Sequence, residues 1–104
     1  MDIQTLRYFL AIVREENISR AAETAFISQP ALSRRMAQLE EELGVQLFER
    51  GKRLRLTDAG VTLSKRATEV VEMVEKIKVE CTGGDTVSGI ISIGRSEERR
   101  VGKE

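Results

Sequence analysis

Three polar side chains near the start of one predicted helix have the chemistry to read the edges of DNA bases. Gln29, Ser33 and Arg34 fall within six residues of one another. Gln can pair bidentately with adenine, Arg with guanine and Ser with either base, and the neighbouring Pro30 leaves room for close approach. An isolated helix of this composition is usually just an amphipathic helix with a solvated face. No acid lies between Gln29 and Gln38. A solvated face would not require this absence, so it favours base recognition.

Catalytic and metal chemistry have few residues to rest on. The 104 residues include no His and a single Cys, so imidazole catalysis, Cys/His zinc sites and an internal disulfide are excluded. Ser28 and Ser33 have no His to activate them, and the consecutive Glu side chains at 40–42 diverge on a helix. We therefore expect no enzymatic activity, no catalytic residue, no bound metal and no cofactor.

Positive charge is concentrated in one short segment, although the chain as a whole is neutral. Lys and Arg together number 17, as do Asp and Glu, so the net charge predicts no general attraction to nucleic acid or to a membrane. Four cations nevertheless fall within residues 50–55 with no acid among them, namely Arg50, Lys52, Arg53 and Arg55. A charged hairpin tip is usually only solvated surface. Beside a helix that enters a DNA groove, it would supply positive partners for phosphates.

The elements that must position these side chains begin with two predicted helices. From Asp2 to Glu16 the apolar residues recur at intervals of three and four, which predicts one helix with a single buried face. Ser19 is expected to cap a second, short helix that ends at Ala25, because a Ser hydroxyl can accept a hydrogen bond from a first-turn amide.

A third predicted helix carries the polar side chains described first. Ser28 is its expected cap, and Pro30 lies in the first turn, where backbone amides need no intrahelical partner. The helix extends from residue 29 to residue 43, because Gly44 supplies a left-handed stop. Two helices joined by a very short turn, the second opened by a Pro, are typical of a helix-turn-helix.

An alternating pattern replaces the helical one after residue 44. Within residues 53–56 Arg alternates with Leu, which predicts a strand with one apolar side. A preceding strand at 47–50 and a two-residue turn at Gly51 and Lys52 would complete a β-hairpin, because Gly at the first central position suits a type II′ turn. A hairpin in this place would be the wing of a winged helix-turn-helix.

A long helix is predicted after the hairpin, capped by Thr57 and running from Asp58 to about Cys81. It would be about 36 Å long at 1.5 Å per residue, too long for one small domain to cover. Apolar residues recur along it with heptad spacing, at Leu63, Ala67, Val70, Val74, Ile77 and Cys81. We interpret them as a stripe that pairs with a helix of another molecule, the alternative being packing against the chain's own core.

The remaining segments add little to the predicted fold. Gly83 and Gly84 end the long helix, residues 87–94 have the pattern of a first strand, and residues 95–104 are polar and unpatterned. The tail RSEERRVGKE resembles the translation of a sequencing-adapter read and is excluded from the fold prediction. No run of about 18 apolar residues and no signal peptide is found, so we expect a cytoplasmic protein with no membrane partner.

The run AAETAFISQPALSRRMAQLEEELGVQLFER, followed by LTDAG, resembles the N-terminal DNA-binding region of the LysR-type transcriptional regulators. The resemblance extends over residues 1 to about 94, and SQPALSRRMAQLEEELG is its most specific part. It implies a winged helix-turn-helix, a linker helix that pairs with its copy in a homodimer, and an effector-sensing domain whose sequence beyond residue 94 is missing. RNA polymerase would be a further partner of the full-length parent protein.

The same resemblance implies roles for individual positions. The residues that would face the major groove are Gln29, Pro30, Ser33 and Arg34. The residues that would lie near the DNA backbone are Ser28 and Arg35. The wing residues that would reach phosphate or the minor groove are Arg50 or Arg53, with Lys52 as a third candidate.

The sequence therefore predicts a mainly α protein. A winged helix-turn-helix of three helices and a β-hairpin occupies residues 1–57, a long dimerisation helix 58–82, the start of an effector domain 83–94, and a non-native tail 95–104. The predicted function is sequence-specific transcription regulation at a double-stranded DNA operator. The alternative from another class is a protein-interaction module, in which the stripe pairs with a different protein and the helix-turn-helix is only a scaffold. A winged-helix repressor of another family is disfavoured, because the long helix directly follows the wing.

Overall fold

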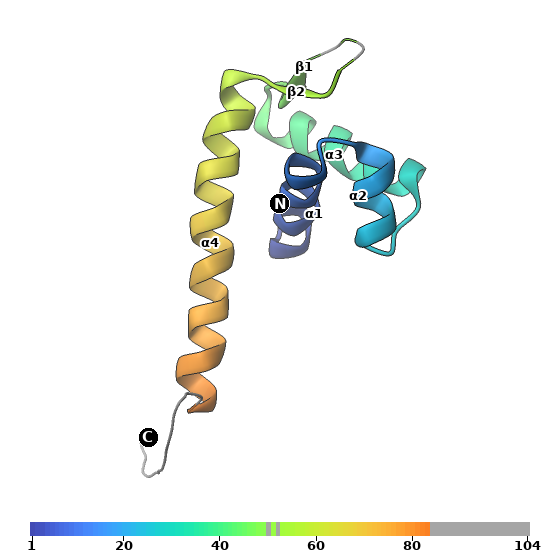
Figure 1. Cartoon of the computed structure of the whole chain (residues 1–104). Helices are drawn as coiled ribbons and strands as arrows, with labels where there is room; N and C mark the ends of the chain where they lie inside the picture. Colours follow the sequence, from blue (N-terminus) through green and yellow to red (C-terminus); the bar gives the residue numbers. More distant parts are fainter. Residues whose placement is uncertain (50, 52, 84–104) are drawn as a thin grey trace. The chain divides into compact units, whose positions relative to one another are not determined.

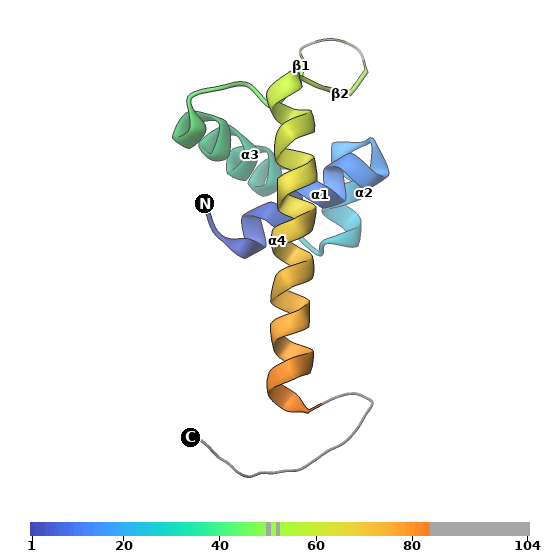
Figure 2. The same ribbon diagram turned by 90° about the vertical axis from the view of Figure 1, so that its left-hand side faces the viewer.

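The computed structural model describes residues 1–49, 51 and 53–83, and these residues form four helices and one two-stranded sheet. In chain order the elements are α1 (Ile3–Glu15), α2 (Ile18–Thr24), α3 (Gln29–Leu43), β1 (Phe48–Glu49), β2 (Arg55–Leu56) and α4 (Asp58–Thr82) (Figures 1 and 2). The chain divides within α4 into two compact units, one of residues 1–71 and one that begins at residue 72. The predicted class of three helices and a hairpin followed by a long helix is confirmed.

Side-chain caps define where α1 and α2 begin. Asp2 precedes α1, and its carboxylate accepts a hydrogen bond from the backbone amide of Thr5 at 2.8 Å. Asn17 caps α2 in the same way, because its side-chain oxygen accepts from the backbone amide of Arg20 at 2.8 Å. The prediction that Ser19 caps α2 is therefore wrong. Ser19 already lies in the first turn of the helix, so its hydroxyl serves another contact.

The turn between α2 and α3 is tight, since only four residues separate the two helices. Within it Phe26 has a left-handed backbone with a φ of 58°, and its side chain is 96% exposed. The amide of Ile27 donates to the carbonyl of Ala22 at 3.0 Å. A bulky residue rarely adopts this conformation on its own. The turn is therefore imposed by its hydrogen bonds and by the packing of the two helices that it joins.

The predicted limits of α3 are confirmed at both ends. The Ser28 hydroxyl accepts a hydrogen bond from the Ala31 amide at 3.2 Å, and Pro30 lies in the first turn. Gly44 ends the helix with a left-handed φ of 73°. Both signals are local in sequence, which is why the residue types alone predicted them.

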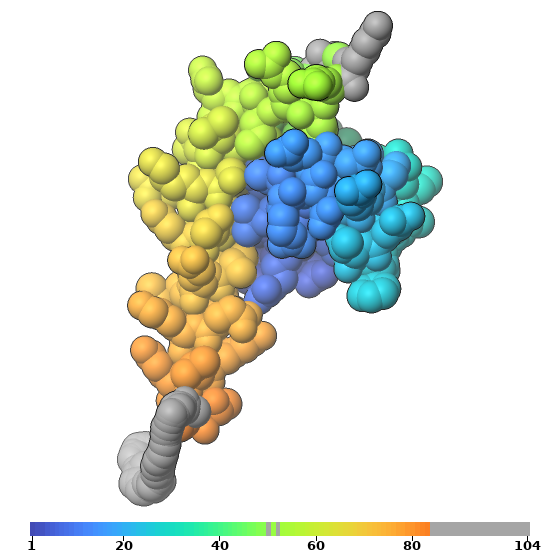
Figure 3. All heavy atoms as spheres, in the orientation of Figure 1, coloured from blue at the N-terminus to red at the C-terminus, as the bar shows by residue number. Residues whose placement is uncertain are grey.

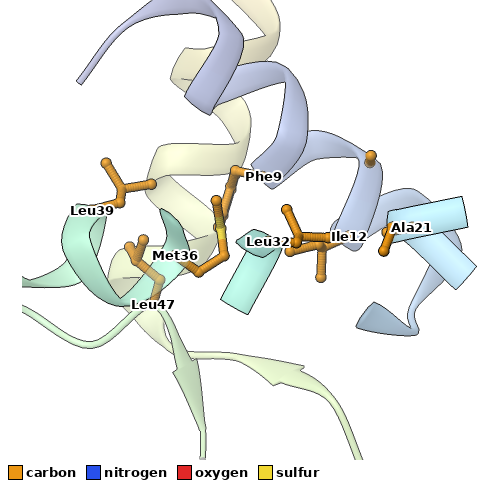
Figure 4. Close-up of a cluster of buried hydrophobic side chains, with 9 residues drawn as sticks. Phe9, Ile12, Ala21, Leu32, Met36, Leu39 and Leu47 are labelled. Atoms are coloured by element: carbon orange, nitrogen blue, oxygen red, sulfur yellow. The ribbon is translucent and has the colours of Figure 1, made fainter. Parts of the chain in front are cut away.

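The core forms where α1, α2 and α3 pack against one another and against the segment before β1. The largest fully buried side chains are Phe9, Ile12, Leu32, Leu39 and Leu47. Figure 4 shows them meeting between the helices, with Met36 beside Phe9 and Leu47. In the space-filling view of Figure 3, the dark-blue and lighter-blue atoms of the first two helices lie directly against one another. Full burial of each such side chain contributes about 1.5–3 kcal/mol to the free energy of folding.

The hairpin forms with a different register from the predicted one. A two-residue turn at 51 and 52 would place Phe48 opposite Arg55, whereas the structure pairs Phe48 with Leu56 and Glu49 with Arg55. Residues that face each other across two strands lie on the same side of the sheet. The observed register therefore puts Phe48 and Leu56 together on the side that packs against the core. Residues 50–54 connect the strands, and the predicted type II′ turn falls partly outside the described residues.

Helix α4 begins where predicted. The Thr57 hydroxyl accepts from the amide of Gly60 at 3.0 Å and donates to the carbonyl of Gln46 at 2.6 Å, so it caps α4 and ties it to the segment before β1. Gly60 lies so close to this segment that an added Cβ would collide with the Leu47 carbonyl oxygen. After Thr82 the helix ends at Gly83, which has a φ of 75°. The predicted strand at 87–94 and the tail lie outside the described residues.

Candidate nucleic-acid interface

The two faces of α3 separate core residues from the polar residues that the sequence singles out. Leu32, Met36 and Leu39 are buried. The exposed positions at and just before the start of α3 are Ser28, Gln29, Pro30, Ser33 and Arg34. Arg34 has no hydrogen-bond or ion-pair partner among the residues that the structure describes. Its guanidinium therefore offers five N–H donors to a ligand.

Gln29 has a partner on the neighbouring helix. The hydroxyl of Ser19, on α2, donates a hydrogen bond to Oε1 of Gln29 at 2.7 Å, and both side chains are exposed. Ser19 is a residue of the candidate site that the sequence analysis does not identify, because it predicts Ser19 as a helix cap. No periodic signal marks such a pair, since the contact depends on how the tight turn sets α2 against α3.

The side chain of Arg35, the immediate neighbour of Arg34, contacts α1 and is 40% exposed. Its Nη1 donates to the Thr5 hydroxyl at 3.2 Å and lies 3.9 Å from the Asp2 carboxylate. Its guanidinium lies 5.2 Å from the centre of the Tyr8 ring, within the range of a cation–π contact. Hydrogen bonds from Thr5, helped by the positive charge of Arg35, hold the pKa of Asp2 below its ordinary value of 3.8. Arg35 thus joins α3 to α1.

An open groove of about 840 Å³ lies between the start of α2 and the hairpin. The residues that line it include Glu16, Asn17, Ser19, Glu49, Arg53 and Arg55. Arg53 and Arg55 are exposed and, within the described part of the chain, have no acidic partner. The groove is therefore polar and of mixed charge, with free cations on its hairpin side. Arg50 and Lys52, the other two predicted wing residues, lie outside the described residues.

Glu40 fixes the hairpin to α3. Its Oε2 accepts hydrogen bonds from the amides of Leu47 at 2.8 Å and Phe48 at 3.3 Å. The first amide lies just before β1 and the second belongs to its first residue, so neither can bond within a helix. The sequence shows Glu40 only as one of three consecutive acids on a helix, so this anchoring role was not predicted.

The residues of the predicted stripe on α4 differ in exposure. Ala67 is buried, and Leu63 is half-buried and packs against the core of its own unit. Val70 and Ile77 are 42% and 51% exposed, and Met73, which the prediction omitted, is 56% exposed. Val74 is half-buried and Cys81 is exposed. The exposed apolar residues thus recur at Val70, Met73 and Ile77, with spacings of three and four.

The described residues lack both a metal-binding cluster and a membrane-spanning helix. No cluster of three or more His, Cys, Asp or Glu side chains among them could hold a metal ion. None of their helices combines the length and the apolar character needed to cross a membrane.

Comparison with known proteins gives one consistent match. Residues 3–61 fit the model of a family described as "Bacterial regulatory helix-turn-helix protein, lysR family". The HTH-type transcriptional regulator BsdA of Bacillus subtilis strain 168 is 41% identical over 97 residues, which cover 90% of this chain and 33% of BsdA. The DNA-binding transcriptional dual regulator OxyR of Escherichia coli K12 is 38% identical over 96 residues, covering 90% and 32% of the two chains. The chain thus spans about a third of the length of these curated relatives.

Solved structures match the fold over a similar range. The complex of the BenM DNA-binding domain with benA site 1 DNA has a TM-score of 0.75 and 40% identity, covering 79% of this chain and 92% of that one. The CbnR DNA-binding domain in complex with DNA has a TM-score of 0.71 and 35% identity, covering 75% and 91%.

Proposed function

Because the chain belongs to the lysR family of bacterial regulatory helix-turn-helix proteins, we propose that it binds a double-stranded DNA operator sequence-specifically and so regulates transcription. The observation that carries the proposal is the exposed start of α3, where Gln29, Ser33 and Arg34 project away from a well-packed core and Arg34 has no partner among the described residues. The solved DNA complexes of related domains support it. Relatives known as transcriptional regulators agree with a function that is not enzymatic.

Within this function the residues divide by what each can offer to DNA. Gln29, Ser33 and Arg34 read base edges in the major groove, and Pro30 allows the helix to approach closely. Ser28 contacts the backbone beside them. Cations of the wing bind phosphate or the minor groove, the candidates being Arg50, Lys52 and Arg53. Arg35 contacts α1 and is also 40% exposed, and its proposed place is near the DNA backbone.

A second copy of the chain is the proposed partner of α4. The exposed apolar side chains at Val70, Met73 and Ile77 would be covered by the same helix of the other copy. Two linked domains would then bind two half-sites of one operator. A cytoplasmic location follows from binding chromosomal DNA. Effector sensing and contact with RNA polymerase are proposed only for a longer parent protein.

The test is binding of the whole chain to a duplex that it selects from a randomised library, measured at low and high salt against an unrelated duplex. We expect a clear preference for the selected duplex and a steep loss of affinity with salt, with a slope of about 0.9 per phosphate neutralised. A protein-interaction module with a helix-turn-helix scaffold would select no sequence. Absence of both preference and salt dependence would therefore reject the proposal in favour of that module.

A further inference from the structure

We propose that Ser19 is a positioning residue that sets base specificity through the side chain of Gln29. The inference rests on the proposed function and deepens it, because it identifies a specificity determinant outside the reading helix. Its basis is the hydrogen bond of 2.7 Å from the Ser19 hydroxyl to Oε1 of Gln29. The bond crosses from α2 to α3 over the tight turn, between two side chains that are both exposed.

A Gln side chain on a surface samples many rotamers, and binding to a base must freeze them. A side chain that is already held in one orientation loses less conformational entropy on binding. Gln29 is the first residue of α3, so the rest of the helix does not surround its side chain. Ser19 is the one described residue with a side-chain hydrogen bond to it. The bond therefore reduces the freedom of Gln29 before any ligand arrives.

The position of Ser19 is itself well fixed. It lies in the first turn of α2, whose amides are capped by Asn17. Two residues later α2 is anchored in the core by Ala21 and Ala22, which are 0% and 3% exposed. The hydroxyl is therefore presented from a rigid backbone, as a positioning group requires.

The contact also decides which atoms of Gln29 remain for a base. An amide oxygen has two lone pairs and an amide nitrogen has two hydrogens. Ser19 occupies one lone pair of Oε1 and leaves the second, together with both hydrogens of Nε2. This set matches adenine, whose N6 amino group donates and whose N7 accepts. Ser19 thus prepares Gln29 for the bidentate pair with adenine.

A direct contact between Ser19 and a DNA phosphate is the competing explanation, because Ser19 also lines the groove beside the wing. The two roles predict different behaviour. A phosphate contact acts alike on every duplex and adds to the salt slope. A positioning role acts only at the base pair that Gln29 reads, and only while Gln29 is present.

The experiment is a double-mutant cycle with Ser19→Ala, Gln29→Ala and the double variant, each made in the whole chain. Ser19→Thr keeps the hydroxyl, and Ser64→Ala is the same chemical change on α4. Circular dichroism first checks that each variant is folded. Affinities are then measured for the selected duplex, for duplexes with each base pair changed singly, and over a range of salt.

We expect Ser19→Ala to lose roughly five-fold to ten-fold of the preference at one A·T pair, the same pair that Gln29→Ala affects, with an unchanged salt slope. Ser19→Thr should retain the preference, and Ser19→Ala should add nothing in the Gln29→Ala background. Additive losses, or a uniform loss on all duplexes with a shallower slope, would overturn the inference and assign Ser19 to a phosphate. Failure of the unmutated chain to select any sequence would instead reject the proposed function, and the inference would fall with it.

Discussion

At the scale of single residues, two adjacent arginines show how the helix geometry separates roles. Successive residues of an α-helix point about 100° apart, so Arg34 and Arg35 face different surroundings. Arg34 is exposed and has no partner within the described residues, whereas Arg35 contacts Thr5, Asp2 and the ring of Tyr8. The identical side chain is therefore available to a ligand at one position and attaches α3 to α1 at the next.

Replacing Arg34 with Ala should weaken binding to the selected duplex by about 1–3 kcal/mol and weaken binding to an unrelated duplex much less. The reason is that a base contact carries sequence information and a phosphate contact does not. Fluorescence anisotropy on both duplexes measures the difference. Arg66→Ala is the matched control, since Arg66 is an exposed arginine on α4 that pairs with Glu69 at 3.0 Å. Equal losses on both duplexes would make Arg34 a backbone contact.

The cap of α1 predicts a pH dependence of stability. Because the folded pKa of Asp2 is lowered, its ionised form stabilises the folded chain above pH 3.8, the ordinary pKa, and this contribution is lost as the pH falls through the lowered value. The Tm difference between the unmutated chain and Asp2→Ala should therefore shrink in acid. Asn17→Ala removes an equivalent cap that does not titrate, so its Tm difference should stay constant. A constant difference for Asp2→Ala as well would contradict the assignment.

At the scale of elements, the close approach of α4 to the segment before β1 depends on the missing side chain of Gly60. An added methyl group would meet the carbonyl oxygen of Leu47, and the Leu56 side chain lies 3.0 Å from the same point. The Leu47 carbonyl also accepts from the Thr57 amide at 3.0 Å, so it is not free to move. Only a residue without a Cβ fits here.

Gly60→Ala should therefore lower the free energy of unfolding by about 1–3 kcal/mol, the usual cost of overpacking, although Ala is the better helix former. Urea unfolding followed by circular dichroism measures the loss. Thr62→Ala, at an exposed position of the same helix, should change stability little. A Gly60→Ala chain as stable as this control would show that the segment can shift without cost.

How far the sequence predicts each element depends on whether its determinants are local. The limits of α3 follow from Ser28, Pro30 and Gly44, which act within a few residues, and the structure confirms them. The cap of α2 was misassigned because Asn17 and Ser19 are both good caps two residues apart. The hairpin register depends on the distant core that Phe48 and Leu56 must cover, which turn chemistry does not encode.

The candidate site was predictable in the same uneven way. The polar residues at the start of α3 stand out by type and spacing. The contacts of Ser19, Arg35 and Glu40 join different elements, and no pattern within one helix reveals them.

At the scale of the whole molecule, α4 has apolar side chains that no other described part of the chain covers. Val70, Met73 and Ile77 are each more than 40% exposed, and their spacing of three and four residues places them in one row along the helix. We therefore expect the chain to be a dimer by analytical ultracentrifugation. Met73→Asp or Ile77→Asp should weaken association by about 3–5 kcal/mol, because each would bury an unpaired charge.

The matched control is Val79→Asp, which introduces the same charge at a position that is 53% exposed but off the row. It should leave association nearly unchanged. A monomeric unmutated chain would reject the dimer, and equal effects of Ile77→Asp and Val79→Asp would reject this row as the interface.

Hydrogen bonds from the start of β1 to Glu40 attach the hairpin to α3, and under the proposed function they fix the spacing between the DNA contacts of the two elements. Glu40 belongs to the same helix as Gln29 and Arg34, so the hairpin is attached to the reading helix itself. Under the proposed function, the distance between the base-reading residues of α3 and the wing is therefore fixed by the protein. The number of residues between the end of β1 and the start of β2 would then set how far along the duplex the wing reaches, while the bases read by α3 stay the same. Inserting residues between the two strands would therefore move the phosphate contacts of the wing along the duplex. The base sequence that the protein prefers would stay the same.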